Sequence, residues 1–380
     1  MSNVMTAEIN HFSIEQTALL KGLGILLIVL HNFFHNLTPH IGENEFAFSY
    51  HTFWDFYHTL LANPESLLQI IFSYFGHYGV QIFVFFSTYG LTRKYLNQPL
   101  VFNEFLKSRI DKIYLSFLLC LAVYIVLGLV KSSFLVHEKV FYWDSLLWKV
   151  LLVSNFIPGQ ALMPVGPWWF LPFIIQVYVL YPFLLKGYQK YGYKLLVLVS
   201  LASLLGEWLI NPYLFSQGMN INYMVFGHLP VICLGIVLAA QTSIKIPIEY
   251  TVLALLLFML GNFNQTIWMV ADISFTILIL AVSIVAFKAP LQHPFIRGLF
   301  IFYGNISFQL FMVNGFLRSP FHNFAETHNL WWIDNLAALA SLLFSTVCAF
   351  FLSKIDKRIR TFLINNCYLS LQLTNCPKST

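Results

Sequence analysis

The residues best suited to chemistry lie in one apolar stretch near the start of the sequence, between Lys21 and His35. His31 and His35 are four residues apart, so both imidazoles lie on one face if the stretch is helical. Ionisable side chains inside a membrane are costly and are usually retained for a function. His31 is therefore a candidate general base or acyl acceptor, and both His35 and the adjacent Asn32 are candidates to share that role.

The same histidines allow other interpretations. Two imidazoles at this spacing can bind a metal ion, but the sequence offers no clear third ligand nearby, so we predict no metal site. Each imidazole can instead be structural and bond to a neighbouring helix.

Lys21 lies at a different depth from the histidines, because ten residues of helix correspond to ~15 Å along the axis at 1.5 Å per residue. One interpretation is an anchor whose ammonium group reaches the membrane surface. The other is a phosphate clamp for a cofactor, formed by Lys21 with cations of later segments. Those candidates are Arg93, Lys94, Arg109 and Lys112.

Composition places these side chains in a membrane protein. The chain has 380 residues, 58% hydrophobic and 10% charged, whereas soluble domains carry roughly 25% charged residues. The mean hydropathy is +0.71. The net charge of +5 is spread along the chain without a basic block, so no nucleic-acid partner is expected. The five cysteines show no Cys-x-x-Cys spacing, which argues against a disulfide framework.

Apolar runs of spanning length predict an all-α, polytopic membrane protein with about ten transmembrane helices. Lys and Arg cluster after the even-numbered runs, which places both termini in the cytoplasm by the positive-inside rule. We expect one transmembrane domain over 1–360, with 38–69 as an outer loop or lid, and a cytoplasmic tail over 361–380. The apolar runs are 17–37, 70–92, 112–132, 167–186, 193–211, 223–241, 249–263, 267–288, 299–318 and 332–353.

This topology brings four further polar residues to the same outer leaflet as His31, where they are expected to line a polar cavity. Either Asp272 or Glu207 is a candidate to orient His31, as a carboxylate orients the imidazole of a catalytic triad. Four cations on the predicted outer side are exceptions to the charge rule: Lys131, Lys139, Lys149 and Arg318. The four polar residues are Glu207, His228, Asp272 and Asn314.

Several segments together resemble one family of membrane enzymes. The sequence LLKGLGILLIVLH at 19–31 is similar to the first-helix signature of the acyltransferase 3 family, in which a basic residue and Gly open the helix and His closes it. Segments 76–95, 166–184, 228–239 and 306–316 resemble later motifs of that family in the right order.

The sequence departs from the family pattern at three places. The usual spacing puts the histidine eleven positions after the basic residue, where this chain has Asn32, and His31 comes one position earlier. One residue turns a side chain by about 100° around a helix. The usual Ser-Gly is Ser87-Thr88, and the late histidine of the family is Asn314.

The resemblance implies transfer of an acyl group, usually acetyl, from cytoplasmic acetyl-CoA to a sugar hydroxyl of an extracytoplasmic glycan. It also implies a multi-pass protein of a bacterial inner membrane, with the lipid bilayer, the glycan and acyl-CoA as partners. Lys21 and the other cations would face the donor, and His31 would deprotonate the hydroxyl or carry the acyl group. The expected substrate-binding residues are Trp168, Trp169, Gln176, Tyr178, His228 and Asn314.

Other functions and structural roles fit the same residues. The polar groups could form the path of a transporter for a lipid-linked sugar or small solute, although the spans do not divide into two similar halves. A non-catalytic membrane scaffold is a third possibility. Trp168 and Trp169 could belong to an aromatic belt, and Gln176 could simply bond two helices.

Overall fold

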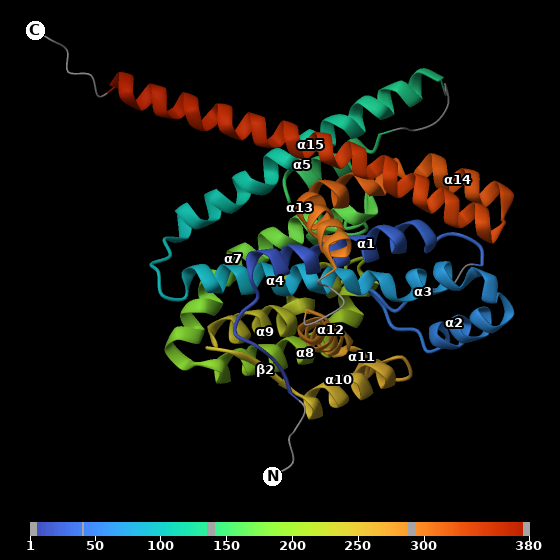
Figure 1. Ribbon diagram of the computed structural model, residues 1–380, viewed down its shortest axis with the longest axis horizontal. Helices are drawn as coiled ribbons and strands as arrows, with labels where there is room; N and C mark the ends of the chain where they lie inside the picture. Colours follow the sequence, from blue (N-terminus) through green and yellow to red (C-terminus); the bar gives the residue numbers. More distant parts are fainter. Residues whose placement is uncertain (1–5, 40–41, 135–140, 288–292, 375–380) are drawn as a thin grey trace, which may run out of the picture.

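The computed structural model describes residues 6–39, 42–134, 141–287 and 293–374. The described chain is almost entirely helical, which confirms the predicted all-α class (Figure 1). One short antiparallel sheet pairs β1 (Thr6–Ile9) with β2 (Ile244–Pro247). The helices are α1 (Ile14–Phe34), α2 (His51–Ala62), α3 (Leu67–Phe75), α4 (Gly79–Tyr95), α5 (Phe102–Phe134), α6 (Trp143–Val150), α7 (Phe170–Tyr191), α8 (Tyr193–Ser216), α9 (Leu229–Ala240), α10 (Ile248–Gly261), α11 (Gln265–Trp268), α12 (Ala271–Ala286), α13 (Pro294–Leu317), α14 (Ser319–His328) and α15 (Trp331–Thr374).

Short 3-10 segments connect several of these helices. Those closest to the cavities described below are η2 (Gly76–Tyr78), which joins α3 to α4, and η4 (Gly166–Trp169), which leads into α7. The others are η1 (Pro64–Ser66), η3 (Ser154–Phe156), η5 (Ile221–Tyr223) and η6 (Val225–His228).

Within the described residues, seven helical segments are long and apolar enough to cross a membrane. Three shorter apolar helices lie at 225–240, 248–261 and 271–286. Each predicted apolar run overlaps one of these segments, but the shorter ones fall below the ~20 residues that a perpendicular crossing needs. The structure therefore supports a multi-pass membrane protein, and the count of ten crossings stays a prediction.

Polar contacts between distant segments join residues that the predicted topology assigns to one side. Glu8 pairs with Lys245 at 3.0 Å, and Glu15 pairs with Arg297 at 2.6 Å. At the opposite end, the Tyr74 hydroxyl donates to Asn262 Oδ1 at 2.5 Å. These contacts are consistent with alternating crossings.

Helix α1 holds a central place, because it packs extensively against α13 and also against α3 and α4. Ser13 and Gln16 form a capping box that satisfies free backbone amides at its start. A Cβ at Gly22 would overlap the Phe300 carbonyl, and one at Gly76 would lie 2.6 Å from His31 Cβ. Glycine at these positions lets α13 and η2 approach the backbone of α1.

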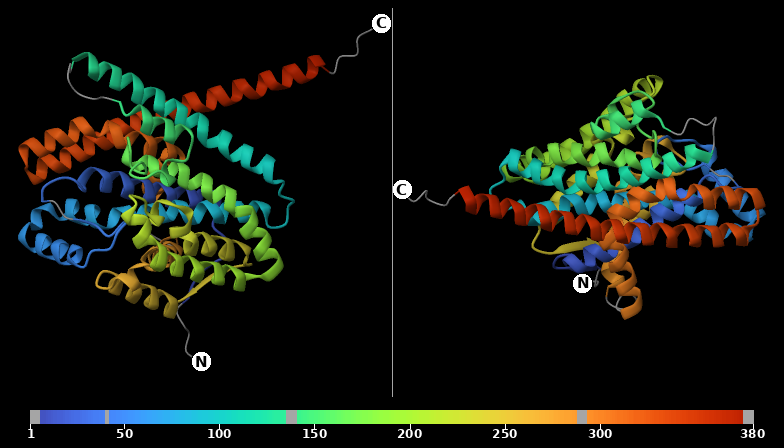
Figure 2. Two further views of the ribbon diagram at one scale, coloured as in Figure 1. Left: turned by 180° about the vertical axis from the view of Figure 1, so that it is seen from behind. Right: turned by 90° about the horizontal axis from the view of Figure 1, so that it is seen from above.

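Two predicted boundaries can be compared with the fold. Segment 38–69 contains α2 and η1, so much of it is folded. Helix α15 runs through residues 360 and 361 without interruption and crosses α5 (Figures 1 and 2). The expected border between the domain and its tail therefore falls inside a continuous helix.

Candidate active site

The end of α1 opens into a small cavity that we call the histidine pocket, with a volume of about 150 Å³. Its wall includes η4, the end of α13 and the segment between α1 and α2. Its polar residues are His31, Asn32, His35, Glu43, Glu45, His77 and Arg318.

His31 is buried in this pocket and held in one orientation by backbone carbonyls. Its Nδ1 lies 3.0 Å from the Ser73 carbonyl oxygen and 3.3 Å from that of Phe72, and the side chain is 4% exposed. A carbonyl only accepts hydrogen bonds, so Nδ1 carries the proton in the neutral ring and Nε2 keeps its lone pair. Nε2 lies 3.7 Å from Glu45 Oε2. This geometry suits a base whose protonated form is stabilised by a carboxylate.

Two charged groups outside the spanning helices set the electrostatics of the pocket. Burial raises the pKa of the Glu45 carboxyl, and the neighbouring His31 opposes that rise. Burial lowers the pKa of Arg318 to about 10, so its guanidinium stays charged at neutral pH. Arg318 donates to the carbonyl oxygen of Asn32. The pocket thus holds both a carboxylate and a fixed cation near the His31 imidazole.

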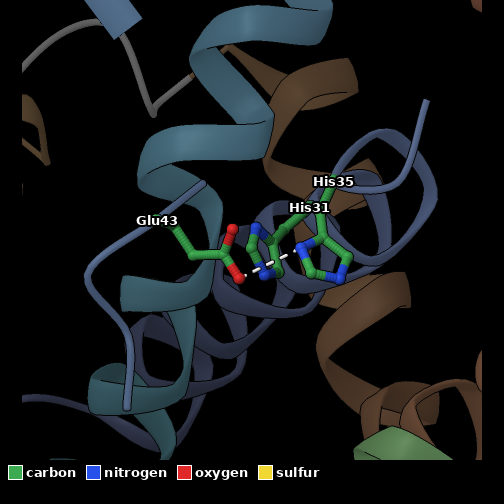
Figure 3. A group of neighbouring side chains, drawn as sticks. All are labelled: His31, His35 and Glu43. Atoms are coloured by element: carbon green, nitrogen blue, oxygen red, sulfur yellow. Dashed lines mark ion pairs between the residues drawn. The ribbon is translucent and has the colours of Figure 1, made fainter. Parts of the chain in front are cut away.

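His35 faces the same pocket. Its Nδ1 lies 3.0 Å from Glu43 Oε1, and its ring centroid lies 5.2 Å from that of His31 (Figure 3). His77 from η2 approaches from another side, with its ring centroid 5.6 Å from His31. The structure therefore gathers three imidazoles where the sequence indicated two.

The carboxylates proposed to orient His31 lie elsewhere. Asp272 Oδ2 is 3.3 Å from Nδ1 of His228, so this carboxylate pairs with a different imidazole. Glu207 borders a separate cavity beside Trp208 and Asn211. The prediction that Asp272 or Glu207 orients His31 is not supported, because α8 and α12 present these side chains to other partners. Glu45 occupies the place next to His31.

A second, larger cavity, which we call the basic cavity, has a volume of about 570 Å³. Lys21 and Lys112, two of the predicted phosphate-binding residues, line it. Among the described residues, the Lys21 ammonium has no hydrogen-bond or ion-pair partner. Such a cation is available to an anionic ligand. Other polar residues of the wall are Ser87, Ser116, Tyr178, Asn305, Ser307, Gln309, Asp356, Lys357 and Arg360.

Asp356 does not cancel the positive character of this cavity, since Arg360 already binds it. Arg360 Nε and Nη2 donate to the two Asp356 oxygens at 2.8 and 2.9 Å. Ser116 donates to the same carboxylate at 3.1 Å. The lysines of the wall therefore remain for a ligand.

The other predicted phosphate-binding cations do not line the basic cavity. Arg93 donates to the Ala239 carbonyl at 3.2 Å. The Lys94 ammonium lies 4.9 Å from the Tyr95 ring, and the Arg109 guanidinium lies 5.5 Å from the Phe105 ring. These contacts fix helix ends and do not bring the three cations to the cavity wall.

The predicted substrate-binding residues separate into different environments. Trp169 lines the histidine pocket, and Tyr178 lines the basic cavity. Trp168 is fully buried and donates from Nε1 to the Met312 carbonyl at 2.8 Å, so it has no surface for stacking on a sugar. Gln176 Oε1 accepts from the Val225 amide at 3.0 Å, which is a bond between helical segments.

His228 and Asn314 also have protein partners. His228 stacks on Trp169 at 6.0 Å and pairs with Asp272. Asn314 Oδ1 accepts from Asn32 Nδ2 at 3.2 Å. Asn32 and Asn314, which stand where the family usually has histidines, are thus bonded to each other. His31, the residue before Asn32, presents its imidazole to Glu45.

The two cavities share part of their walls. Ile28, Val80 and Phe311 border both the basic cavity and the histidine pocket. All three side chains are at most 6% exposed. We call these three residues the septum, because one layer of apolar side chains lies between the two cavities.

Sequence reasoning missed several residues of the histidine pocket. Glu43 and Glu45 lie in a loop whose sequence has no helical periodicity. His77 lies in segment 76–95, which resembles the family through its glycines and aromatic residues. Arg318 carried a usable signal, since it is a cation on the side where the charge rule expects few.

Comparison with known proteins places the chain in a family. The acyltransferase 3 family model, described as an acyltransferase domain, matches residues 16–354, which is nearly the whole chain. No curated protein and no solved structure matches the chain.

Proposed function

This chain belongs to the acyltransferase 3 family, and on that premise we propose that it transfers an acetyl group from acetyl-CoA to a hydroxyl of an envelope glycan. The acetyl-CoA would bind from the cytoplasm, and the glycan would bind on the other side of a bacterial inner membrane. His31 would act as the general base or carry the acyl group transiently.

The observation that carries this proposal is the shared septum. A donor in the basic cavity and an acceptor near His31 would be separated only by Ile28, Val80 and Phe311. An acyl group is small and apolar enough to enter such a layer, whereas the charged part of its carrier is not. The arrangement therefore suits a reaction in which two substrates stay on opposite sides and only an acyl group passes.

The walls of the basic cavity fit the donor. CoA carries several phosphates, and the unpaired Lys21 with Lys112 and Lys357 would neutralise part of that charge. The aromatic side chains Phe83, Phe170 and Phe308 would contact the apolar parts of the carrier. Lys21 would thus do more than anchor α1 at the membrane surface.

The proposed chemical step uses the lone pair of His31 Nε2. Nε2 takes the proton of the acceptor hydroxyl, the hydroxyl oxygen bonds to the thioester carbonyl carbon, and the carbon–sulfur bond breaks. The CoA thiolate leaves and takes that same proton from the imidazolium, which returns to the neutral imidazole. Glu45 would stabilise the imidazolium, and the Arg318 guanidinium would stabilise the oxyanion that forms between the two steps.

The predicted topology indicates which end of the helix bundle would face the cytoplasm. Contacts such as Glu8–Lys245 and Glu15–Arg297 join segments that the predicted topology assigns to the side where most cations cluster. By the positive-inside rule this end of the bundle would face the cytoplasm, and the basic cavity lies nearer to it than His31 does. Both termini would then be cytoplasmic.

The test combines a cellular and a purified assay. Mass spectrometry of envelope glycans should show a base-labile acetyl group that disappears when the gene is deleted and returns with the wild-type gene. Purified protein in liposomes should release CoA from acetyl-CoA only when an acceptor extract is present on the opposite side. Transport of labelled glycan without release of CoA would instead support the transporter. Unchanged glycans together with no CoA release would count against acyl transfer.

A further inference from the structure

The histidine pocket contains three side chains whose ligand atoms lie close enough to share one cation. One ring nitrogen each from His31 and His35 and one carboxylate oxygen of Glu43 lie within 4.8 Å of one another. Figure 3 shows the three side chains gathered around a common space. Two ligand atoms of a tetrahedral zinc site with bonds of 2.0–2.1 Å lie ~3.3 Å apart. His35 Nδ1 and Glu43 Oε1 are 3.0 Å apart, which is already close to that separation.

The orientation of His31 also suits a metal ligand. Its Nδ1 donates to the Ser73 carbonyl at 3.0 Å, so the lone pair of Nε2 faces the pocket. Metal-binding histidines usually donate their second ring nitrogen to a carbonyl or carboxylate in this way. The backbone of α3 therefore supplies the support that a metal-bound imidazole needs.

Further donors surround these three residues. Among the described residues, neither ring nitrogen of the buried His77 has a hydrogen-bond partner. Its ring lies 5.6 Å from that of His31, and Glu45 Oε2 lies 3.7 Å from His31 Nε2. An unsatisfied buried imidazole is unusual and calls for a partner. The charge of Arg318 opposes a cation, but two carboxylates face it in the same pocket.

We propose that His31, His35 and Glu43 bind one transition-metal cation, represented by Zn²⁺, and that this ion inhibits acyl transfer. The inhibition, unlike the binding, rests on the proposed function. Two imidazoles with a carboxylate favour zinc over Mg²⁺ or Ca²⁺, which take oxygen ligands. A zinc ion on His31 Nε2 occupies the lone pair that would accept the proton of the hydroxyl. The metal and the acceptor therefore exclude each other.

The binding is tested on chelator-treated, detergent-purified protein with metal ions alone. Equilibrium dialysis with Zn²⁺ should give one ion per chain, and Co²⁺ should give the intense visible absorption of a tetrahedral site with nitrogen ligands. Glu43→Gln should weaken zinc binding roughly 10–100-fold, since it replaces a charged ligand by a neutral one. Glu326→Gln is the matched control, because Glu326 lies 3.8 Å from a different imidazole, that of His322, and should leave the affinity unchanged.

The outcomes separate the metal site from the function. Absence of zinc binding, or an equal affinity in wild type and Glu43→Gln, overturns the site even if the protein releases CoA. Zinc that binds through Glu43 but leaves CoA release unaffected overturns the inhibition. Zinc that binds through Glu43 in a protein without any transferase activity supports the site and counts against the proposed function.

Discussion

The basic cavity and the histidine pocket share α1, α13 and the septum, yet they are built differently. The basic cavity has a volume of about 570 Å³, and its wall combines a few cationic side chains with many apolar ones. The histidine pocket has only about 150 Å³, and nearly half of its wall residues are polar, with His31 held by a backbone carbonyl and His35 by a carboxylate. The first cavity suits recognition of a large anionic carrier by charge and size. The second suits a reaction that depends on the position of a few atoms.

This difference shows how one helix can serve two purposes. Lys21 and His31 lie on the same helix at different depths, so the rigid backbone of α1 sets the distance between donor binding and chemistry. Changes in the histidine pocket should therefore lower the turnover rate kcat, whereas changes in the basic cavity should raise the donor KM.

Replacement of the imidazole should have the largest effect. His31→Ala is expected to lower kcat by about 100–10,000-fold, the usual contribution of a general base, with little change in the donor KM. CoA release in liposomes measures both constants. His58→Ala, which removes an exposed imidazole from α2, serves as the control. Retained activity in His31→Ala would shift the base to the neighbouring imidazole of His35.

The carboxylate beside His31 should contribute a smaller factor that depends on pH. Because burial raises the pKa of Glu45, its carboxylate becomes protonated at a higher pH than an ordinary glutamate as the solution is acidified. Its stabilisation of the imidazolium is then lost, so activity should fall as pH falls through that raised value. Glu45→Gln should lower kcat roughly 10–100-fold and remove this acid dependence.

The test for Glu45 is a kcat profile against pH, measured with saturating donor. Glu65→Gln changes an exposed glutamate of the same outer segment and should keep the wild-type profile. A Glu45→Gln variant with the wild-type acid limb would assign that limb to another group and weaken the contrast between the cavities.

Removal of the unpaired lysine should affect the other cavity. Lys21→Ala is expected to raise the donor KM about 10-fold, as for loss of one charge-assisted contact, while kcat at saturation changes little. Lys190→Ala, an exposed lysine over the Tyr191 ring, is the control. A fall in kcat without a change in KM would show that Lys21 acts on the chemical step and would remove the division between the cavities.

The septum should set which acyl groups pass between the cavities. Phe311→Leu widens the layer and should raise the use of butyryl-CoA relative to acetyl-CoA by roughly 10-fold, in the range that small apolar differences allow. Because both donors are measured on one variant, the ratio is insensitive to lost stability. Phe308→Leu changes a phenylalanine of the basic cavity alone and should leave the ratio unchanged.

How far the sequence predicts this site depends on the element that carries each residue. The apolar runs predict the helices, and the helical rise predicts the depths of Lys21 and His31. Depth along a helix does not determine which neighbour a side chain faces, so depth makes Asp272 and Glu207 equal candidates to orient His31, although Asp272 pairs with His228. Glu43 and Glu45 reach the pocket through an irregular loop, whose path depends on tertiary contacts that no sequence period records.

The smallest expected effect concerns the wall of the histidine pocket. Lys149 in α6 is fully buried and donates to the Ala161 carbonyl at 2.5 Å, next to Leu162 of that wall. Burial lowers the pKa of Lys149 to about 7 from its ordinary 10.5. Between these values the unfolded chain binds more protons than the folded one, so stability should rise with pH across this range. A thermal midpoint in detergent should increase by roughly 1 °C for each kcal/mol gained in a chain of this length. Lys149→Met should flatten this slope, whereas Lys190→Met, which changes an exposed lysine, should leave it as in the wild type if the buried charge of Lys149 is its cause.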